Sequence, residues 1–346
     1  MRPAGPRELG GWDELVAGNP DGGQILQTRA WGEFKRAHRW QPRYLLSETD
    51  PPVAVLVLRH AIPGLGVLGY VPKGPGVSGA AQLPALIEGL RDTAGSAFAI
   101  KVEPEIEQSD GAAAALRDMG LEKSRHDVQI SRATIIVDLR PEEDAMLASF
   151  KPKCRYNIRL AQRRRVTVAP VPLDDEHIDA MYALMASTRD RAGFTLRSRE
   201  YFAQYWRLHA AAGQGQLFFA SLDGLVLAGV FATYLGKKAW YKDGGSTKEH
   251  SDVMAPHLLQ WEVMRWLRAR GVEAYDLVAV PPAAELNPGH ALFGLYRFKS
   301  GFSEHITEYV GTWDLPIGRR RYAAWNAVAE RAAHQWAYRV RHDLLF

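Results

Sequence analysis

The chain has one cysteine and no long apolar run. Cys154 alone excludes an internal disulfide and a cysteine-rich metal site, and it fits a reducing compartment. No apolar stretch approaches the roughly 20 residues of a membrane span, and the first residues lack the apolar core of a signal peptide. We therefore expect a cytoplasmic protein. The histidines lack paired metal-ligand spacing, so no metal site is predicted.

The composition is that of a globular protein. With 346 residues, 47% apolar and 10% aromatic, the chain is long enough for about two domains with their own cores, which excludes a disordered protein. The net charge is only +4, but residues 151–165 carry seven basic side chains and no acidic one. Such a segment attracts phosphate groups, although a solvated helix face would have the same composition.

One order of elements occurs twice along the chain. Each copy has a three-stranded meander, a loop, a helix and a further strand. In the first copy the expected elements are Arg43–Ser47, Val53–Arg59, Val67–Val71, the helix Leu83–Arg91 and the strand Ala97–Glu103. In the second they are Leu217–Ser221, Leu225–Tyr234, Lys238–Lys242, the helix Pro256–Arg270 and the strand Tyr275–Val280. Asp223-Gly224 is a strong hairpin signal. An internal duplication in the order of the GNAT acyltransferase fold explains the pattern.

Four motifs resemble one family of enzymes. They are WGEFK at 31–35, KPKCRYNIRLAQRR at 151–164, AWYKDGGS at 239–246 and GLYRFKSGF with YVGTWDLP between 294 and 316. The sequence resembles the FemABX family, tRNA-dependent peptidyltransferases that add amino acids to the stem peptide of cell-wall precursors. The resemblance implies an α/β (α+β) fold of two tandem GNAT-like domains, with mixed sheets flanked by helices and no coiled-coil insertion. Domain 1 is expected at 1–141, completed by 317–346, and domain 2 at 142–316.

The reaction that this resemblance implies is attack by an amine on the ester between an amino acid and tRNA. The protein must position two substrates and stabilise an oxyanion. Lys299 of the FK motif is expected to stabilise the oxyanion, with its side chain held by Phe298 and Phe302. The alternative is a structural lysine that covers apolar surface. No cofactor is expected.

Two carboxylates are candidates for the base that deprotonates the attacking amine. Glu103 and Asp243 are each expected at a strand end, where carboxylates also cap loops. Family members commonly have a second tyrosine at the position of Asp243. The resemblance also allows a group of the substrate to take the proton.

The acceptor implied by the resemblance is a muramyl-peptide precursor, either lipid II or a UDP-linked form, whose diphosphate favours basic side chains. Lys35, Arg197 and Tyr201 are the expected ligands, with Tyr241 of the AWYKDGGS motif. The spacing of Arg197 and Tyr201 places them on one face if a helix has begun there. Without the resemblance, Lys35 would be an ordinary lysine of an amphipathic helix.

The basic segment is the expected binding surface for aminoacyl-tRNA. Its tRNA ligands are Lys153, Arg155, Arg159 and Arg163, with Tyr156 and Ile158 expected on a packed face. The C-terminal segment from Arg319 onward has an apolar stripe, six arginines and two acidic residues. It can pack on domain 1 or lie on anionic lipid at the inner membrane face. We expect a monomer.

Two other functions compete with this interpretation. An acyl-CoA-dependent GNAT enzyme needs a Q/R-x-x-G-x-G/A loop for the CoA pyrophosphate, and the matching loops KGPGVSGAAQ and GGSTKEHSDVMAP lack it. A non-catalytic tRNA-binding protein would explain the basic segment but neither FKSGF nor AWYKDGGS. The sequence therefore favours aminoacyl transfer.

Overall fold

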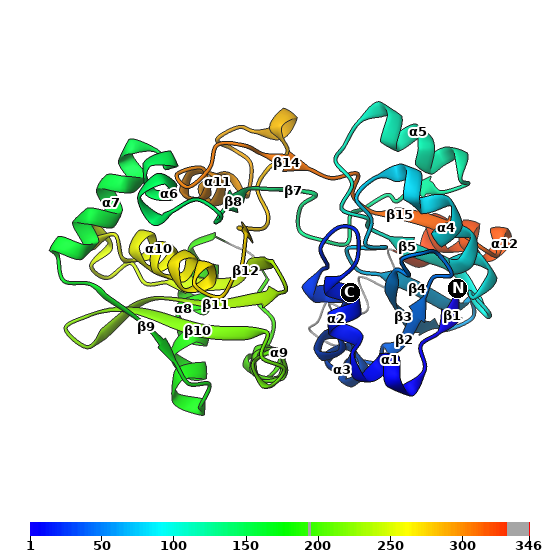
Figure 1. Cartoon of the computed structure of the whole chain (residues 1–346), viewed down its shortest axis with the longest axis horizontal. Helices are drawn as coiled ribbons and strands as arrows, with labels where there is room; N and C mark the ends of the chain where they lie inside the picture. The colour runs from blue at the N-terminus through cyan, green and yellow to red at the C-terminus, as the bar shows by residue number, and fades with distance from the viewer. Residues whose placement is uncertain (193–194, 331–345) are drawn as a thin grey trace. The chain divides into compact units, whose positions relative to one another are not determined.

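The computed structural model describes residues 1–192, 195–330 and 346, and it divides the chain into two compact units (Figure 1). Unit 1 comprises Met1–Arg132 and Glu308–Phe346, and unit 2 comprises Ala133–Thr307. The chain passes from unit 1 to unit 2 after Arg132 and returns to unit 1 after Thr307, in both places earlier in the sequence than the predicted domain boundaries. At the first boundary, residues 136–138 already pair within the sheet of unit 2; at the second, the strand β15 (Trp313–Pro316) joins the sheet of unit 1. No helix in the described residues is long and apolar enough to cross a membrane.

Unit 1 is built on a seven-stranded sheet. The order is β1-β2-β3-β4-β5-β15-β6, and only the β4–β5 pair is parallel. The strands are β1 (Arg2–Pro3), β2 (Gln41–Leu46), β3 (Ala54–Ile62), β4 (Gly66–Val71), β5 (Ala97–Val102), β15 and β6 (Glu122–Lys123). The parallel pair requires a crossover, which the predicted helix between β4 and β5 provides.

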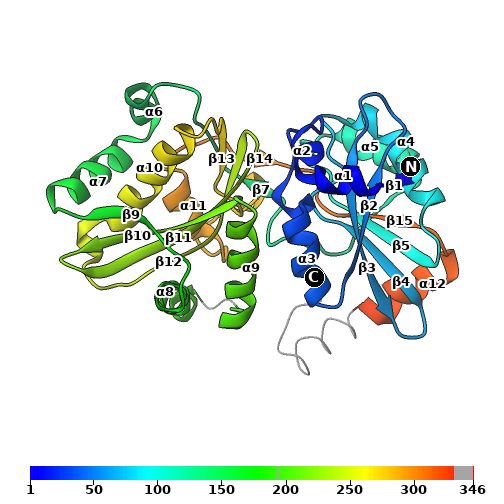
Figure 2. The same ribbon diagram turned by 60° about the horizontal axis from the view of Figure 1, so that its bottom comes forward.

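Helices cover both faces of this sheet. One face packs on α4 (Leu83–Asp92) and α5 (Asp110–Asp118) through an aliphatic core. The other face packs on α2 (Trp12–Ala17), α3 (Arg29–Ala37) and α12 (Arg319–Ala324), as Figure 2 shows; α1 (Pro6–Gly10) precedes α2. The start of the C-terminal segment therefore packs on unit 1; the rest of its stripe, including Ala332, Trp336 and Val340, lies outside the described residues.

Unit 2 repeats this arrangement. Its sheet has the order β8-β13-β12-β11-β10-β9, again with one parallel pair, β12–β13. The strands are β8 (Ile136–Asp138), β13 (Ala274–Asp276), β12 (Lys238–Ser246), β11 (Leu225–Leu235), β10 (Gly215–Leu222) and β9 (Thr167–Val171). Asp223 and Gly224 both have positive φ, as a two-residue hairpin turn requires, so the predicted hairpin is confirmed.

The helices of unit 2 also lie on two sides of its sheet (Figure 2). On one side α7 (Pro152–Arg163) and α10 (Ala255–Arg268) enclose the main apolar core, after α6 (Glu143–Ser149). On the other side α8 (Asp175–Ala192) and α9 (Arg199–Ala211) pack on β10, β11 and β12. The remaining α-helix is the short α11 (Phe293–Lys299), and the remaining strands form a two-stranded pair, β14 (Thr307–Glu308) with β7 (Ala133–Thr134).

Candidate active site

Lys299 is the last residue of α11, and its side chain is buried in unit 2. Only 4% of the residue is exposed. Its Nζ donates hydrogen bonds to the backbone carbonyls of Val278 and, at 3.0 Å, of Ala279. Among the described residues it has no ion pair, so the contacts that hold this ammonium are neutral.

The two carbonyls belong to a strained turn. Val278 and Ala279 have φ of 56° and 40°, in the left-handed region that non-glycine residues seldom adopt and that a β-branched residue adopts least. Asp276 holds the turn, because its Oδ1 accepts from the backbone N–H of Val278 at 2.6 Å and from the hydroxyl of Thr134. The predicted strand at 275–280 therefore ends at Asp276, and the turn aims its carbonyls at Lys299.

Burial changes the acidity of this lysine. It lowers the pKa of Lys299 to about 7, and the negative charge of Asp276 opposes that shift only in part. Near neutral pH the amine is thus poised between its charged and neutral forms. An ordinary surface lysine would be charged throughout the neutral range.

An aromatic ring lies next to Lys299, but it belongs to Tyr241 rather than to a phenylalanine of the FK motif. The Nζ of Lys299 is 5.7 Å from the centroid of the Tyr241 ring. Phe298 instead makes edge contacts with the rings of His257, at 5.1 Å, and Phe302, at 5.5 Å. Consecutive helix residues point in different directions, so Phe298 and Lys299 cannot share one environment. The expected clamp of Phe298 and Phe302 around Lys299 is not formed.

Asp243 lies inside β12 and not at a strand end as predicted. It faces Phe231 beside an irregularity in the β11–β12 register, and the strand continues to Ser246. Its buried Oδ2 accepts from the indole Nε1 of Trp206 at 2.9 Å. Burial raises the pKa of Tyr241 to about 12, and the negative charge of Asp243 contributes to this rise.

The glycines that follow Asp243 are explained by close packing. A Cβ on Gly244 would lie 2.3 Å from the Tyr241 ring, and one on Gly245 would lie 2.5 Å from the backbone of Leu184 in α8. Only glycine fits at either position. The AWYKDGGS motif therefore holds Tyr241 and Asp243 in a strand pressed directly against a helix.

Glu103 follows β5 directly, so its predicted place at a strand end in unit 1 is confirmed. It is 4% exposed, and both its oxygens already accept hydrogen bonds. The donors are the hydroxyl of Tyr70 at 2.5 Å and the hydroxyl of Thr312 at 2.6 Å. These contacts tie β4, β5 and the segment before β15 together.

Lys35 is buried in unit 1 on α3. Its Nζ lies 4.9 Å from the centroid of the Trp31 ring, one helical turn earlier. A lysine 4% exposed is unusual on an amphipathic helix, whose charged residues normally face water.

Arg197 and Tyr201 meet, although not on one helix. The helix α9 begins at Arg199, with Ser198 as its N-cap, so Arg197 precedes it. The guanidinium of Arg197 nevertheless lies 4.3 Å from the centroid of the Tyr201 ring. The contact depends on the turn before α9 and not on helical spacing.

The predicted tRNA ligands of α7 fall into two groups. Lys153, Arg159 and Arg163 are exposed and have no acidic partner among the described residues. Arg155 instead donates to the carbonyls of Ala148, at 3.0 Å, and Phe150 near the end of α6. Arg155 is therefore used to cap α6, which its place in the basic segment does not reveal.

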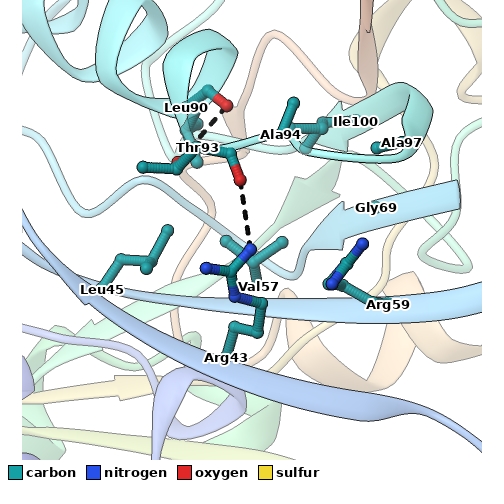
Figure 3. A pocket seen from close by; sticks show the side chains of 10 residues that line it. All are labelled: Arg43, Leu45, Val57, Arg59, Gly69, Leu90, Thr93, Ala94, Ala97 and Ile100. Carbon is teal, nitrogen blue, oxygen red and sulfur yellow. Dashed lines mark hydrogen bonds between the residues drawn. The ribbon is translucent and has the colours of Figure 1, made fainter. Parts of the chain in front are cut away.

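A small pocket in unit 1 contains none of the predicted site residues. Arg43 and Arg59 point into it from β2 and β3, beneath the end of α4 (Figure 3). Arg43 donates to the carbonyl of Thr93 at 3.1 Å, and Arg59 to the hydroxyl of Ser96 at 3.0 Å. The two arginines satisfy acceptors where α4 ends, which accounts for their position.

The sequence interpretation missed three features of this site. The strained turn leaves no signal in composition, because neither Val278 nor Ala279 is typical of left-handed backbone. The buried contact between Asn157 Nδ2 and His257 Nε2, at 3.1 Å, joins α7 to α10 beneath Phe298. Tyr156, expected on a packed face, is 49% exposed, whereas Ile158 is 1% exposed.

Comparison with known proteins gives consistent matches over almost the whole chain. Residues 16–223 match the FemAB family, and residues 148–300 match an acetyltransferase (GNAT) domain. The lipid II:glycine glycyltransferase of Staphylococcus aureus (strain MRSA252) is 24% identical over 400 residues, covering 92% of this chain and 94% of that protein.

Solved structures show the same fold. The crystal structure of FemX aligns with a TM-score of 0.83 at 22% identity, over 94% of this chain and 99% of that one. A tandem GNAT protein from the clavulanic acid biosynthesis pathway aligns with a TM-score of 0.52 at 14% identity, over 90% and 95%. The predicted α/β fold of two tandem GNAT-like domains is confirmed, as is the predicted class of enzyme, an aminoacyltransferase. With more than half of its length matched to one family, the chain belongs to the FemAB family.

Proposed function

We propose that the protein transfers an aminoacyl group from aminoacyl-tRNA to the side-chain amine of the third stem-peptide residue in a peptidoglycan precursor. The amine attacks the ester carbonyl, an amide bond forms and the ester bond breaks. The 3′ hydroxyl of the tRNA leaves with a proton. The name of the relatives, lipid II:glycine glycyltransferase, supports this acceptor class.

The buried amine of Lys299 is the observation that carries the proposal. A charged lysine has three N–H donors, and two of them are used by the carbonyls of Val278 and Ala279. Among the described residues the third has no acceptor. In a water-poor site this N–H stabilises the oxyanion of the tetrahedral intermediate more strongly than an exposed lysine would.

Proton removal from the attacking amine is assigned to the substrate rather than to a carboxylate of the protein. Asp243 accepts a hydrogen bond from the indole of Trp206, and Glu103 accepts hydrogen bonds from the hydroxyls of Tyr70 and Thr312. Both carboxylates are buried, and protonation would weaken the hydrogen bonds that they already accept. The tRNA leaving group takes up a proton in the same reaction, so a substrate oxygen can carry it.

Lys35 in unit 1 and Arg197 in unit 2 are each proposed as a ligand for phosphate of the precursor, and Tyr201 and Tyr241 in unit 2 are proposed as further acceptor contacts. Both cations lie against aromatic rings, which restrict their side chains. Lys153, Arg159 and Arg163 on α7 are proposed to bind tRNA phosphates. A lipid-linked acceptor would place the protein in peripheral contact with the inner membrane face.

The proposal is tested by incubating the purified protein with lipid II, or with the UDP-linked precursor, and a panel of charged tRNAs. Mass spectrometry of the precursor should show the addition of at least one aminoacyl residue with one of the tRNAs. A precursor of unchanged mass with every tRNA would refute aminoacyl transfer. Acetyl-CoA with the same precursors serves as a control for the GNAT chemistry suggested by the match at 148–300.

A further inference from the structure

An exposed tyrosine stands in the middle of the basic face of α7. Tyr156 is 49% exposed, one of few large hydrophobic side chains that the structure leaves in water. The Nζ of Lys153 lies 4.8 Å from its ring centroid, and the guanidinium carbon of Arg163 lies 5.8 Å from it. A ring between cations is the arrangement with which proteins bind unpaired nucleotides: the ring stacks on a base and the cations meet phosphates.

The cations around Tyr156 are available for a partner. Beyond Lys153, Arg159 and Arg163, the exposed Arg164 and Arg165 follow at the end of the helix. None of these five forms an ion pair among the described residues. Cation–π contacts at exposed sites are weak compared with the stacking of a base on an aromatic ring, so a nucleotide can displace Lys153 or Arg163 from the ring.

The opposite face of α7 is fixed to the segment that carries Lys299. The backbone N–H of Lys151 donates to the carbonyl of Gly301 at 2.9 Å, two residues after Lys299. Gly301 also lies against Cys154, where an added Cβ would be 3.2 Å from the Cβ of Cys154. A strand of RNA bound along α7 is therefore held on a helix that is anchored to the candidate active site.

We infer that Tyr156 is a stacking platform for an unpaired base in the single-stranded 3′ end of tRNA, with the neighbouring cations of α7 on the flanking phosphates. This inference rests on the proposed function and deepens it. An unpaired end is favoured over duplex because the bases of a duplex are already stacked. A membrane surface is disfavoured because the apolar face of α7, with Cys154, Ile158 and Ala161, is buried in the core and cannot enter lipid.

The test uses two RNA hairpins with the same stem, one with an unpaired 3′ end and one blunt. A fluorescent adenine analogue in the unpaired end reports stacking by quenching. Tyr156→Ala should bind the RNA with the unpaired end about 5- to 150-fold more weakly and lose the quenching, while Tyr156→Phe keeps both. Leu225→Ala, which removes a side chain 40% exposed on the β10–β11 hairpin, is the matched control.

The outcomes separate the inference from the proposed function. Unchanged binding of Tyr156→Ala to the unpaired end, or an equal loss for the blunt hairpin, would overturn the inference. A Tyr156-dependent loss of binding to vesicles containing phosphatidylglycerol, with RNA binding unchanged, would instead identify a membrane contact. If the wild-type protein transfers no aminoacyl group but binds the unpaired end through Tyr156, the proposed function fails and the inference stands. If transfer proceeds equally well with Tyr156→Ala, the inference alone fails.

Discussion

Replacement of Lys299 by methionine should change how the stability of the protein depends on pH. Methionine keeps the apolar stem and removes the titrating amine. Burial lowers the pKa of Lys299 from 10.5 to about 7. Between those values the unfolded chain binds a proton that the folded chain has lost, so the stability of the wild-type protein rises with pH across this window. The penalty of the buried charge is fully present below pH 7.

The size of this effect follows from the two pKa values. Between pH 7 and pH 9, Lys299 should add about 2 kcal/mol to the free energy of unfolding of the wild-type protein. Urea unfolding gives the free energy of unfolding of the wild type and of Lys299→Met at both pH values. The increase from pH 7 to pH 9 in the wild type, minus the increase in the mutant, is the contribution of Lys299. Arg297→Met, which removes an exposed charge from the same helix, is the control and should show no such change. An identical pH dependence in wild type and Lys299→Met would refute a buried amine with a lowered pKa.

The same substitution separates two chemical roles. If the charged amine stabilises the oxyanion, Lys299→Met should lower turnover about 10²–10³-fold below pH 7. Above pH 7 the ratio of wild-type to mutant turnover should then fall about tenfold per pH unit as the amine loses its proton. A ratio that instead grows with pH would mean that the neutral amine is active, as it would be for a general base.

Three further predictions concern the ligands. Acetyl-CoA should neither raise the melting temperature nor support transfer; stabilisation by several degrees at modest concentration would favour the acyl-CoA interpretation. Lys35→Met and Arg197→Ala should weaken binding of the muramyl precursor in calorimetry and leave tRNA affinity nearly unchanged, whereas equal losses for both ligands would reject their assignment to the diphosphate. The double substitution Arg159→Gln with Arg163→Gln should flatten the slope of log affinity for tRNA against log salt by roughly one to two units, and an unchanged slope would place the tRNA elsewhere.

Much of the fold can be read from local patterns. Short apolar runs and the Asp223-Gly224 turn predict the meander of unit 2, because hairpin geometry depends on adjacent residues. The helix after each meander indicates that the next strand is parallel to the last strand of the meander, because a parallel pair needs a crossover connection between its strands. The twofold occurrence of this order predicts two similar units.

The site could be predicted only in part, because its geometry depends on contacts between distant segments. The position of Asp243 within β12 depends on a register irregularity, and its commitment to Trp206 depends on the packing of α9. The use of Arg155 as a cap depends on where α6 ends. The end of β13 at Asp276 depends on a turn whose residues would otherwise favour a strand. In each case the outcome depends on a tertiary contact that the local sequence does not reveal.

A comparison of two buried lysines, Lys101 in unit 1 and Lys299 in unit 2, supports the role proposed for Lys299. Lys101 in unit 1 is 1% exposed, and its Nζ lies 3.0 Å from Asp314, 3.1 Å from Glu330 and 2.7 Å from the hydroxyl of Ser124. Three acceptors for three N–H groups leave nothing for a substrate, and two carboxylates neutralise the charge. Lys299 is buried to a similar degree but is held by only two neutral carbonyls. Among the described residues Lys299 has a spare donor and no direct ion pair, and the charge of Asp276 offsets its burial only in part. We therefore propose that the negative charge that develops during the reaction is its partner.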